Sequence, residues 1–133
     1  MFLNRLDTQS KQVFLKIAHH VARSDDSFMD IQKALIAGYC AEMDIDDVEF
    51  DENNFSLEDT LKEIVNSDMQ KIILMEVLAI VYADSIMHPA EKEIIDIMVD
   101  TWDINSNLVI VYGEWSKSLL SLSIQGEALL DLN

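Results

Sequence analysis

The chain has 133 residues, half of them hydrophobic, and a formal net charge of −16 at pH 7 from 25 acidic and 9 basic side chains. A surface this acidic repels phosphate backbones and anionic lipid headgroups, which disfavours nucleic-acid binding and argues against a basic membrane-docking patch. Only three glycines and one proline are present, which favours long helices. The single cysteine excludes both an intrachain disulfide and a zinc site of several cysteines. We therefore expect an all-α, soluble, cytosolic protein with no inserted membrane segment.

The first predicted helix begins at Asp7 or Thr8 and runs to about Arg23. Its apolar side chains recur every three to four residues, which is the spacing of one buried stripe. These side chains are Val13, Phe14, Ile17, Ala18 and Val21. His19 and His20 lie near the helix end, where cations suit the helix dipole, and neither has a metal-ligand partner three or four residues away.

A polar turn over residues 24–30 leads to a second predicted helix, which Asp30 caps and which spans about Ile31 to Met43. Its predicted inner face consists of Ile31, Ala34, Leu35, Tyr39 and Met43. Cys40 lies among small and apolar neighbours, so we expect a buried, unreactive thiol. Residues 44–54 are acidic and irregular and form the predicted mobile connection. The predicted anchors of this connection are Val48, Phe50 and Phe55.

A capping-box-like start at Ser56 predicts a short third helix through about Asn66. Its predicted inner face is Leu57, Leu61, Ile64 and Val65. A second start of this kind, at Ser67, opens the most apolar window of the chain, Ile72–Ala83, in which Glu76 is the one charged residue. A helix that is apolar on nearly every side is surrounded by other helices, so this is the predicted central helix. Because buried glutamates are rare, we place Glu76 at a solvent edge, with a carboxylate facing a functional cleft as the alternative.

His88 is predicted to cap the next helix, whose first residue is a proline and which ends at about Trp102. Its inner residues are Ile94, Ile95, Ile97 and Met98. The last helix begins at Asn105 or Ser106. Its predicted buried stripe is Leu108, Val111, Trp115, Leu119 and Leu122. We expect a less regular tail from Ile124, in which two leucines, Leu129 and Leu130, dock on the body.

The chain partly repeats itself after 59 residues, so that residues 13–45 correspond to residues 72–104. Asp25 corresponds to Asp84, and Asp44-Ile45 corresponds to Asp103-Ile104. Each unit consists of a helix, an acidic turn and a second helix. Two such hairpins can pack about a pseudo-two-fold axis, whereas one hairpin alone could not bury its apolar face. Chance similarity between two amphipathic hairpins is the alternative.

The two turns resemble the motif of the tellurite-resistance TerB-like family, in which an apolar helix is followed by Ala-Asp-Gly-x-x-x-x-x-Glu and an amphipathic helix. Residues 83–91 resemble its second copy and residues 24–32 its first, and the resemblance covers most of residues 13–104. Asp26 and Ser85 replace the two glycines, and the first glutamate is Gln32. The resemblance implies one TerB-like domain over residues 1–133 with about six to seven helices. It also implies an association with tellurite resistance and stress responses.

The resemblance further implies a divalent-cation site near the two acidic turns. The residues carried over from the family are Asp25, Asp84 and Glu91, to which we add Asp26, Asp30 and His88 as hypothetical metal ligands. Carboxylates suit Ca²⁺ or Mg²⁺, and a histidine would favour Zn²⁺ or Mn²⁺. The alternative is structural, with Asp84 bonded to backbone N–H groups of its turn and Glu91 stabilising a helix N-terminus.

No nucleophile elbow, P-loop, Rossmann glycine motif or H-E-x-x-H motif is present, so we expect a protein without enzymatic activity. The predicted function is that of a TerB-like module in a stress or tellurite-resistance response, acting through an acidic face that binds a divalent cation or a protein partner. One alternative is a helical protein-interaction domain without an ion, and another is a carboxylate-metal hydrolase. A homodimer is also open, and exposure of Trp115 and Leu119 would mark its face.

Overall fold

The computed structural model describes residues 1–24, 30–82 and 87–132. These residues form six α-helices and two 3-10 turns and contain no strand, which confirms the predicted all-α class. The helices are α1 (Thr8–Ala22), α2 (Asp30–Met43), α3 (Leu57–Lys62), α4 (Ser67–Val81), α5 (Pro89–Trp102) and α6 (Ser106–Leu130). The 3-10 turns are η1 (Leu3–Arg5) and η2 (Glu52–Asn54).

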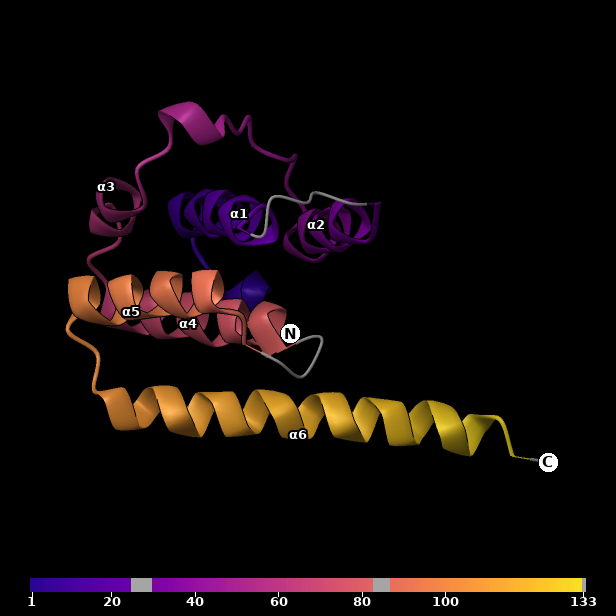
Figure 1. Ribbon diagram of the computed structural model, residues 1–133. Helices are drawn as coiled ribbons and strands as arrows, with labels where there is room; N and C mark the ends of the chain where they lie inside the picture. Colours follow the sequence, from indigo (N-terminus) through magenta and orange to yellow (C-terminus); the bar gives the residue numbers. More distant parts are fainter. Residues whose placement is uncertain (25–29, 83–86, 133) are drawn as a thin grey trace.

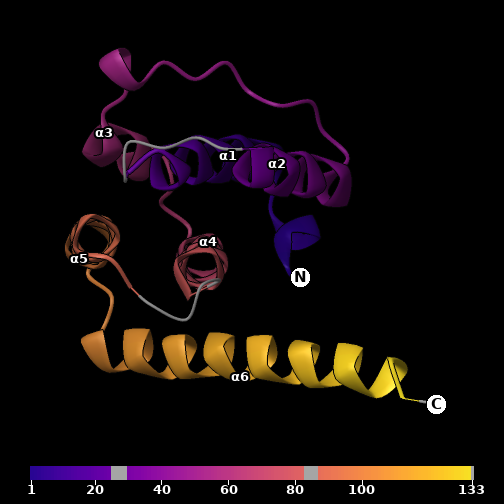
Figure 2. The same cartoon turned by 45° about the vertical axis from the view of Figure 1, so that its right-hand side comes forward.

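The helices lie in three layers (Figures 1 and 2). Helices α1 and α2 lie side by side in one layer, α4 and α5 form the middle layer, and α6 runs along the opposite side. Helix α4 packs against α1 on one side and α6 on the other, and it also contacts α5 and η1. The prediction that the most apolar window is the central helix is therefore confirmed.

Side-chain caps define where the helices begin. The Asp7 carboxylate accepts a hydrogen bond from the backbone N–H of Ser10 at 2.8 Å, which starts α1 as predicted. Helix α4 is capped by Asn66, whose side-chain oxygen accepts from the N–H of Met69 at 3.1 Å. The predicted cap at Ser67 is wrong by one residue, because the amide oxygen of the preceding asparagine takes that role.

The helices on either side of residue 60 have matching lengths. Helices α1 and α4 each have 15 residues, and α2 and α5 each have 14. Helix α4 begins 59 residues after α1, and α5 begins 59 residues after α2. Both α2 and α5 are followed by an aspartate in the left-handed region, Asp44 at φ 55° and Asp103 at φ 50°. The next amides, of Ile45 and Ile104, each donate to the carbonyl five residues earlier, at 3.1 and 3.0 Å. This is the hydrogen-bond pattern of a Schellman helix end.

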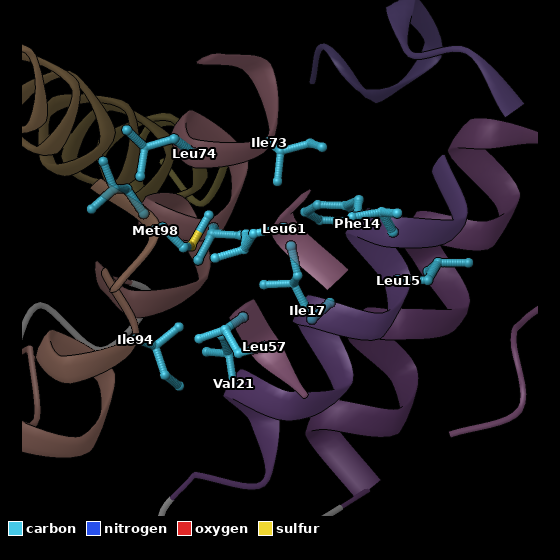
Figure 3. Packing of buried hydrophobic residues seen from close by; sticks show 14 of the residues in the cluster. Phe14, Leu15, Ile17, Val21, Leu57, Leu61, Ile73, Leu74, Ile94 and Met98 are labelled. Carbon is cyan, nitrogen blue, oxygen red and sulfur yellow. The ribbon is translucent and has the colours of Figure 1, made fainter. Parts of the chain in front are cut away.

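The core lies between α1, α3, α4 and α5, and Figure 3 shows their side chains meeting there. Completely buried members include Phe14, Leu15, Ile17, Leu61, Ile73, Leu74 and Met98. Complete burial stabilises an aliphatic side chain by about 1.5–3 kcal/mol. The indole N–H of Trp102 donates to the carbonyl of Leu61 at 2.9 Å, so the end of α5 is joined to α3 by a buried hydrogen bond.

Two predicted inner faces are wrong in part. Ala34 and Leu35 are exposed on α2, whereas Met43 is buried as predicted and Ile36 is buried without having been predicted. Helix α2 lies at the edge of its layer and packs on α1 and η1, so a narrow face suffices. Val65 is 88% exposed, because α3 ends four residues before the predicted end and Val65 lies beyond it.

The predicted inner stripe of α6 is also wrong in part, since only Leu108 and Leu119 of its five residues are half-buried. Val111, Trp115 and Leu122 are exposed, and the buried residues of this helix are Gly113 and Ser116. These small residues allow α6 to approach the end of α4 closely. A Cβ atom at Gly113 would lie 3.1 Å from the ring of Tyr82, so a larger residue here would have to displace that ring slightly.

Helix α6 continues without a break to Leu130, so the prediction of an irregular, docked tail from Ile124 is wrong. Leu129 and Leu130 are exposed, and both views show the end of α6 extending beyond the other helices (Figures 1 and 2). No helix in the described ranges has both the length and the apolar character that crossing a bilayer requires.

Glu76 does not lie at a solvent edge but is buried, with 7% of its surface exposed. Its Oε1 accepts hydrogen bonds from the N–H of Phe2 at 2.7 Å and from the Met1 amino group at 2.9 Å. The neighbouring carboxylate of Glu42 accepts from the N–H of Leu3 at 3.2 Å. The segment that begins the chain therefore covers α4 and supplies the hydrogen bonds that a buried carboxylate requires.

Candidate functional site

Half of the predicted metal ligands, Asp25, Asp26 and Asp84, lie outside the described residues. Asp30 is the first residue of α2 and is exposed. Within the described ranges, no three histidine, cysteine, aspartate or glutamate side chains form a group that could hold a metal ion. The cation site at the two turns therefore stays a prediction.

The other two predicted ligands, His88 and Glu91, lie at the start of α5. His88 is the N-cap residue, and the Glu91 carboxylate accepts a hydrogen bond from its backbone N–H at 3.0 Å. This contact satisfies an N–H group at the helix start and places a negative charge at the positive end of the helix dipole. The geometry supports the structural alternative for Glu91.

An acidic groove follows the loop between α2 and α3. It consists of two neighbouring hollows of about 740 and 480 Å³, both of which are bordered by Lys16 and Glu49. The carboxylates along the groove are Asp44, Asp46, Asp47, Glu49 and Asp51. Five acidic side chains against one lysine give the groove a strongly negative character, which attracts cationic groups.

The loop is held against α1 by buried His19. Its Nε2 lies 2.8 Å from Oδ1 of Asp47, and the same oxygen accepts from the N–H of Val48 at 2.8 Å. On the other side of the ring, Nη1 of Arg23 lies 2.7 Å from Nδ1. A guanidinium group only donates, so we infer that Nδ1 accepts and that the Nε2–H group donates to Asp47.

Aromatic stacking adds a second attachment of the loop. Phe50 stacks on the His19 ring with centroids 5.3 Å apart and planes 12° apart, and Arg23 lies 5.0 Å from the Phe50 centroid. Phe55 contacts both Phe50 and His20, at 5.1 and 4.8 Å. His20 also lies 2.8 Å from the Glu52 carboxylate. The predicted packing of Phe50 and Phe55 against the body is confirmed.

Sequence reasoning missed the role of the two histidines. They were assigned to the dipole of α1, but their partners lie 28 and 32 residues further along the chain. A usable signal was present, because adjacent histidines end a helix and an acidic loop with two phenylalanines follows. Histidine rings can bond carboxylates and stack on aromatic rings at the same time.

Cys40 lines the acidic groove and is partly buried, so its predicted complete burial is wrong. Burial raises the pKa of its thiol, and the negative charges of Asp47 and Asp46 raise it further. The thiol is therefore predominantly protonated at neutral pH and is a weak nucleophile. The groove presents negative charge and apolar edges rather than an activated nucleophile.

Comparisons with protein-family models, with curated proteins and with solved structures find no match to this chain. Carboxylates on a loop with fixed attachments suit a cationic ligand, and the two neighbouring hollows offer it two places of contact.

We expect His19→Phe to lower the free energy of unfolding by about 1–2 kcal/mol, because it removes hydrogen bonds to charged groups while keeping an aromatic ring on Phe50. Amide exchange at Val48 should accelerate, since its acceptor on Asp47 loses its support. Urea unfolding and hydrogen exchange measure these effects. The matched variant His20→Phe should cost less, because the His20 side chain is more exposed than that of His19. Equal costs would contradict this assignment.

Proposed function

We propose that this chain is a TerB-like helical module without catalytic activity, which binds a basic segment of a protein partner along its acidic groove. The observation that carries the proposal is the row of five carboxylates on a loop that His19 and His20 attach to α1. A fixed loop loses less conformational entropy on binding than a free one, so its charges are already arranged for a ligand.

The groove offers two kinds of contact to a basic segment. Exposed carboxylates such as Asp46 and Glu49 can pair with lysine or arginine head groups. Half-buried Ile45 and Val48 line the same groove and can contact the aliphatic stems of those side chains. The net charge of −16 adds long-range attraction for a basic partner, which raises the rate of association more than the affinity.

The TerB-like part of the proposal is supported by the equal helix lengths in the two halves and by the matching left-handed aspartates, Asp44 and Asp103. These features agree with a duplicated helical hairpin, which the resemblance implies. A role in a stress or tellurite-resistance response and a divalent cation at the two acidic turns belong to the same proposal.

The test is fluorescence anisotropy with a labelled peptide of alternating lysine and alanine residues. We expect the double variant Asp46→Asn/Glu49→Gln to weaken peptide binding about fivefold, since two exposed charge pairs together contribute about 1 kcal/mol. Neither carboxylate holds the loop through a hydrogen bond shown above. The matched control, Glu93→Gln/Asp100→Asn, makes the same change of charge on the exposed side of α5.

Equal weakening in the two double variants would mean that only net charge matters and would overturn the proposal. The peptide titration is then repeated in EDTA and with Ca²⁺, Mg²⁺, Mn²⁺ or Zn²⁺, which distinguishes a module that needs a cation from one that does not. A change in peptide affinity on adding a cation supports the ion-dependent module. Unchanged affinity supports the interaction domain that needs no ion.

A further inference from the structure

A stripe of mostly apolar residues runs along one flank of α6 at alternating spacings of four and three residues. This α6 stripe consists of Leu108, Tyr112, Trp115, Leu119, Leu122, Gly126 and Leu129. Trp115 is 37% exposed, Leu122 63% and Leu129 66%. Such spacing is the pattern by which two helices pack side by side, and the end of α6 extends beyond the other helices.

The first half of the α6 stripe borders a small hollow of about 180 Å³ between η1, α4 and α6. Its apolar wall is made by Phe2, Ile72, Met75 and Tyr112, and its edge carries Arg5 and Lys71. The ring of Phe2 lies 5.9 Å from the ring of Trp115, so the hollow and the α6 stripe form one continuous surface. Near the start of α6, the apolar surface is therefore bordered by basic side chains. Towards the end of α6, the stripe itself is mostly apolar.

We propose that a second copy of this chain covers the α6 stripe, with the two α6 helices antiparallel. Pairing Leu119 with Leu122 of the other copy aligns the remaining stripe positions around the two-fold axis. Trp115 then faces Gly126, where a side chain would meet nothing within 4 Å, and Tyr112 faces Leu129. In this register a large residue faces a glycine and a leucine faces a leucine. Close helix packing requires such complementary shapes.

The exposed area of the α6 stripe sets the size of the proposed interface. Its three exposed side chains, Trp115, Leu122 and Leu129, together offer about 100–200 Å² on each copy, taking about 60–120 Å² for a fully exposed aliphatic side chain. Half-buried stripe residues and the apolar wall of the hollow add to this area. A homodimer interface of standard size buries about 800 Å² per copy, so the stripe forms the apolar centre of a smaller interface whose dimer depends on protein concentration.

The charges favour a second copy over a basic partner at this surface. Helix α6 carries only Glu114, Lys117 and Glu127 as charged residues, in a chain of net charge −16. In an antiparallel pair, the acidic helices α1–α5 of the two copies lie at opposite ends of the α6 pair, so their charges are kept apart. It also brings the acidic end of the partner helix toward the basic edge of the hollow. A partner rich in lysine would instead meet the cations at that edge.

The test is sedimentation velocity over a range of protein concentrations, with full-length wild type and single variants. Wild type should sediment as a dimer, and Leu119→Glu and Leu122→Lys should each weaken self-association about 30-fold or more. Leu122 is exposed and Leu119 is half-buried, so circular dichroism checks that the helices persist in both variants. The matched control, Ile110→Glu, changes an exposed residue of α6 outside the stripe and should stay dimeric.

An equimolar mixture of Leu119→Glu and Leu122→Lys should re-form a dimer, because the proposed register places the new glutamate opposite the new lysine. Monomeric wild type at all concentrations, or dimers that survive both stripe variants, would overturn the proposal. A wild-type dimer without rescue in the mixture would overturn the antiparallel register. None of these results depends on peptide binding at the acidic groove, so the two proposals fail independently.

Discussion

Replacing Phe14 by alanine should lower the free energy of unfolding by about 3–5 kcal/mol, the largest loss expected from one residue of this chain. Phe14 is completely buried on α1, and its ring meets Tyr39 of α2 edge to face with centroids 5.2 Å apart. The substitution removes apolar contacts with α2 and with the core between α1 and the middle layer, and it leaves a cavity that close-packed helices cannot refill. Urea unfolding followed by circular dichroism measures the loss.

The matched control is Val65→Ala, which removes apolar volume from a residue that the sequence pattern placed inside. Val65 is 88% exposed, so its replacement should change the free energy of unfolding by less than about 0.5 kcal/mol. A small effect at Phe14, or a loss of more than about 1 kcal/mol at Val65, would contradict the burial described for these two residues.

Most helix boundaries could be predicted because local groups determine them. Asp7 bonds the first turn of α1, and the His88-Pro89 pair begins α5 at the predicted residue. Such signals involve residues two to four positions apart, so they can be recognised in a sequence. The central position of α4 was predictable for another reason, since a helix apolar on all sides must be covered by other helices.

The inward face of α6 could not be predicted by the same reasoning. This helix carries apolar residues on several faces, and hydrophobicity alone favours Trp115 and Leu122 as core residues. The close approach of α4 instead selects the small residues Gly113 and Ser116 for the buried contact. Whether a large apolar side chain faces the core depends on the partner helix, which periodicity does not reveal.

The candidate site shows the same division between local and distant contacts. The acidic character of residues 44–54 and their aromatic anchors could be predicted, because both are properties of that segment. The attachment of the loop through His19 and Asp47 joins residues 28 positions apart, and sequence spacing gives no measure of that contact. The role of Glu91 was foreseen only as an alternative, and its hydrogen bond to His88 favours that alternative.

The second large effect is expected at Glu76. Replacing this buried carboxylate by leucine should lower the free energy of unfolding by about 2–3 kcal/mol, because it removes charge-assisted hydrogen bonds. The N–H of Phe2, 2.7 Å from Oε1, would lose its acceptor unless the segment detached into water. Detachment would expose Leu3, which is completely buried, and would open the peptide bond after Arg5 to trypsin.

Urea unfolding measures the stability loss at Glu76, and limited trypsin digestion followed by mass spectrometry measures the release of the segment. The matched control is Glu42→Gln, which alters the second carboxylate that bonds the same segment but is more exposed. Water can replace the contacts of Glu42, so this variant should lose less than about 1 kcal/mol and resist cleavage at Arg5. The assignment would be contradicted if Glu76→Leu unfolded at the same urea concentration as wild type and trypsin still did not cleave after Arg5. Glu76 would then not be the residue that holds the segment on α4.

Because Phe2 contacts Trp115, release of the segment should also make the surroundings of that indole more polar, which fluorescence detects independently of the unfolding curve.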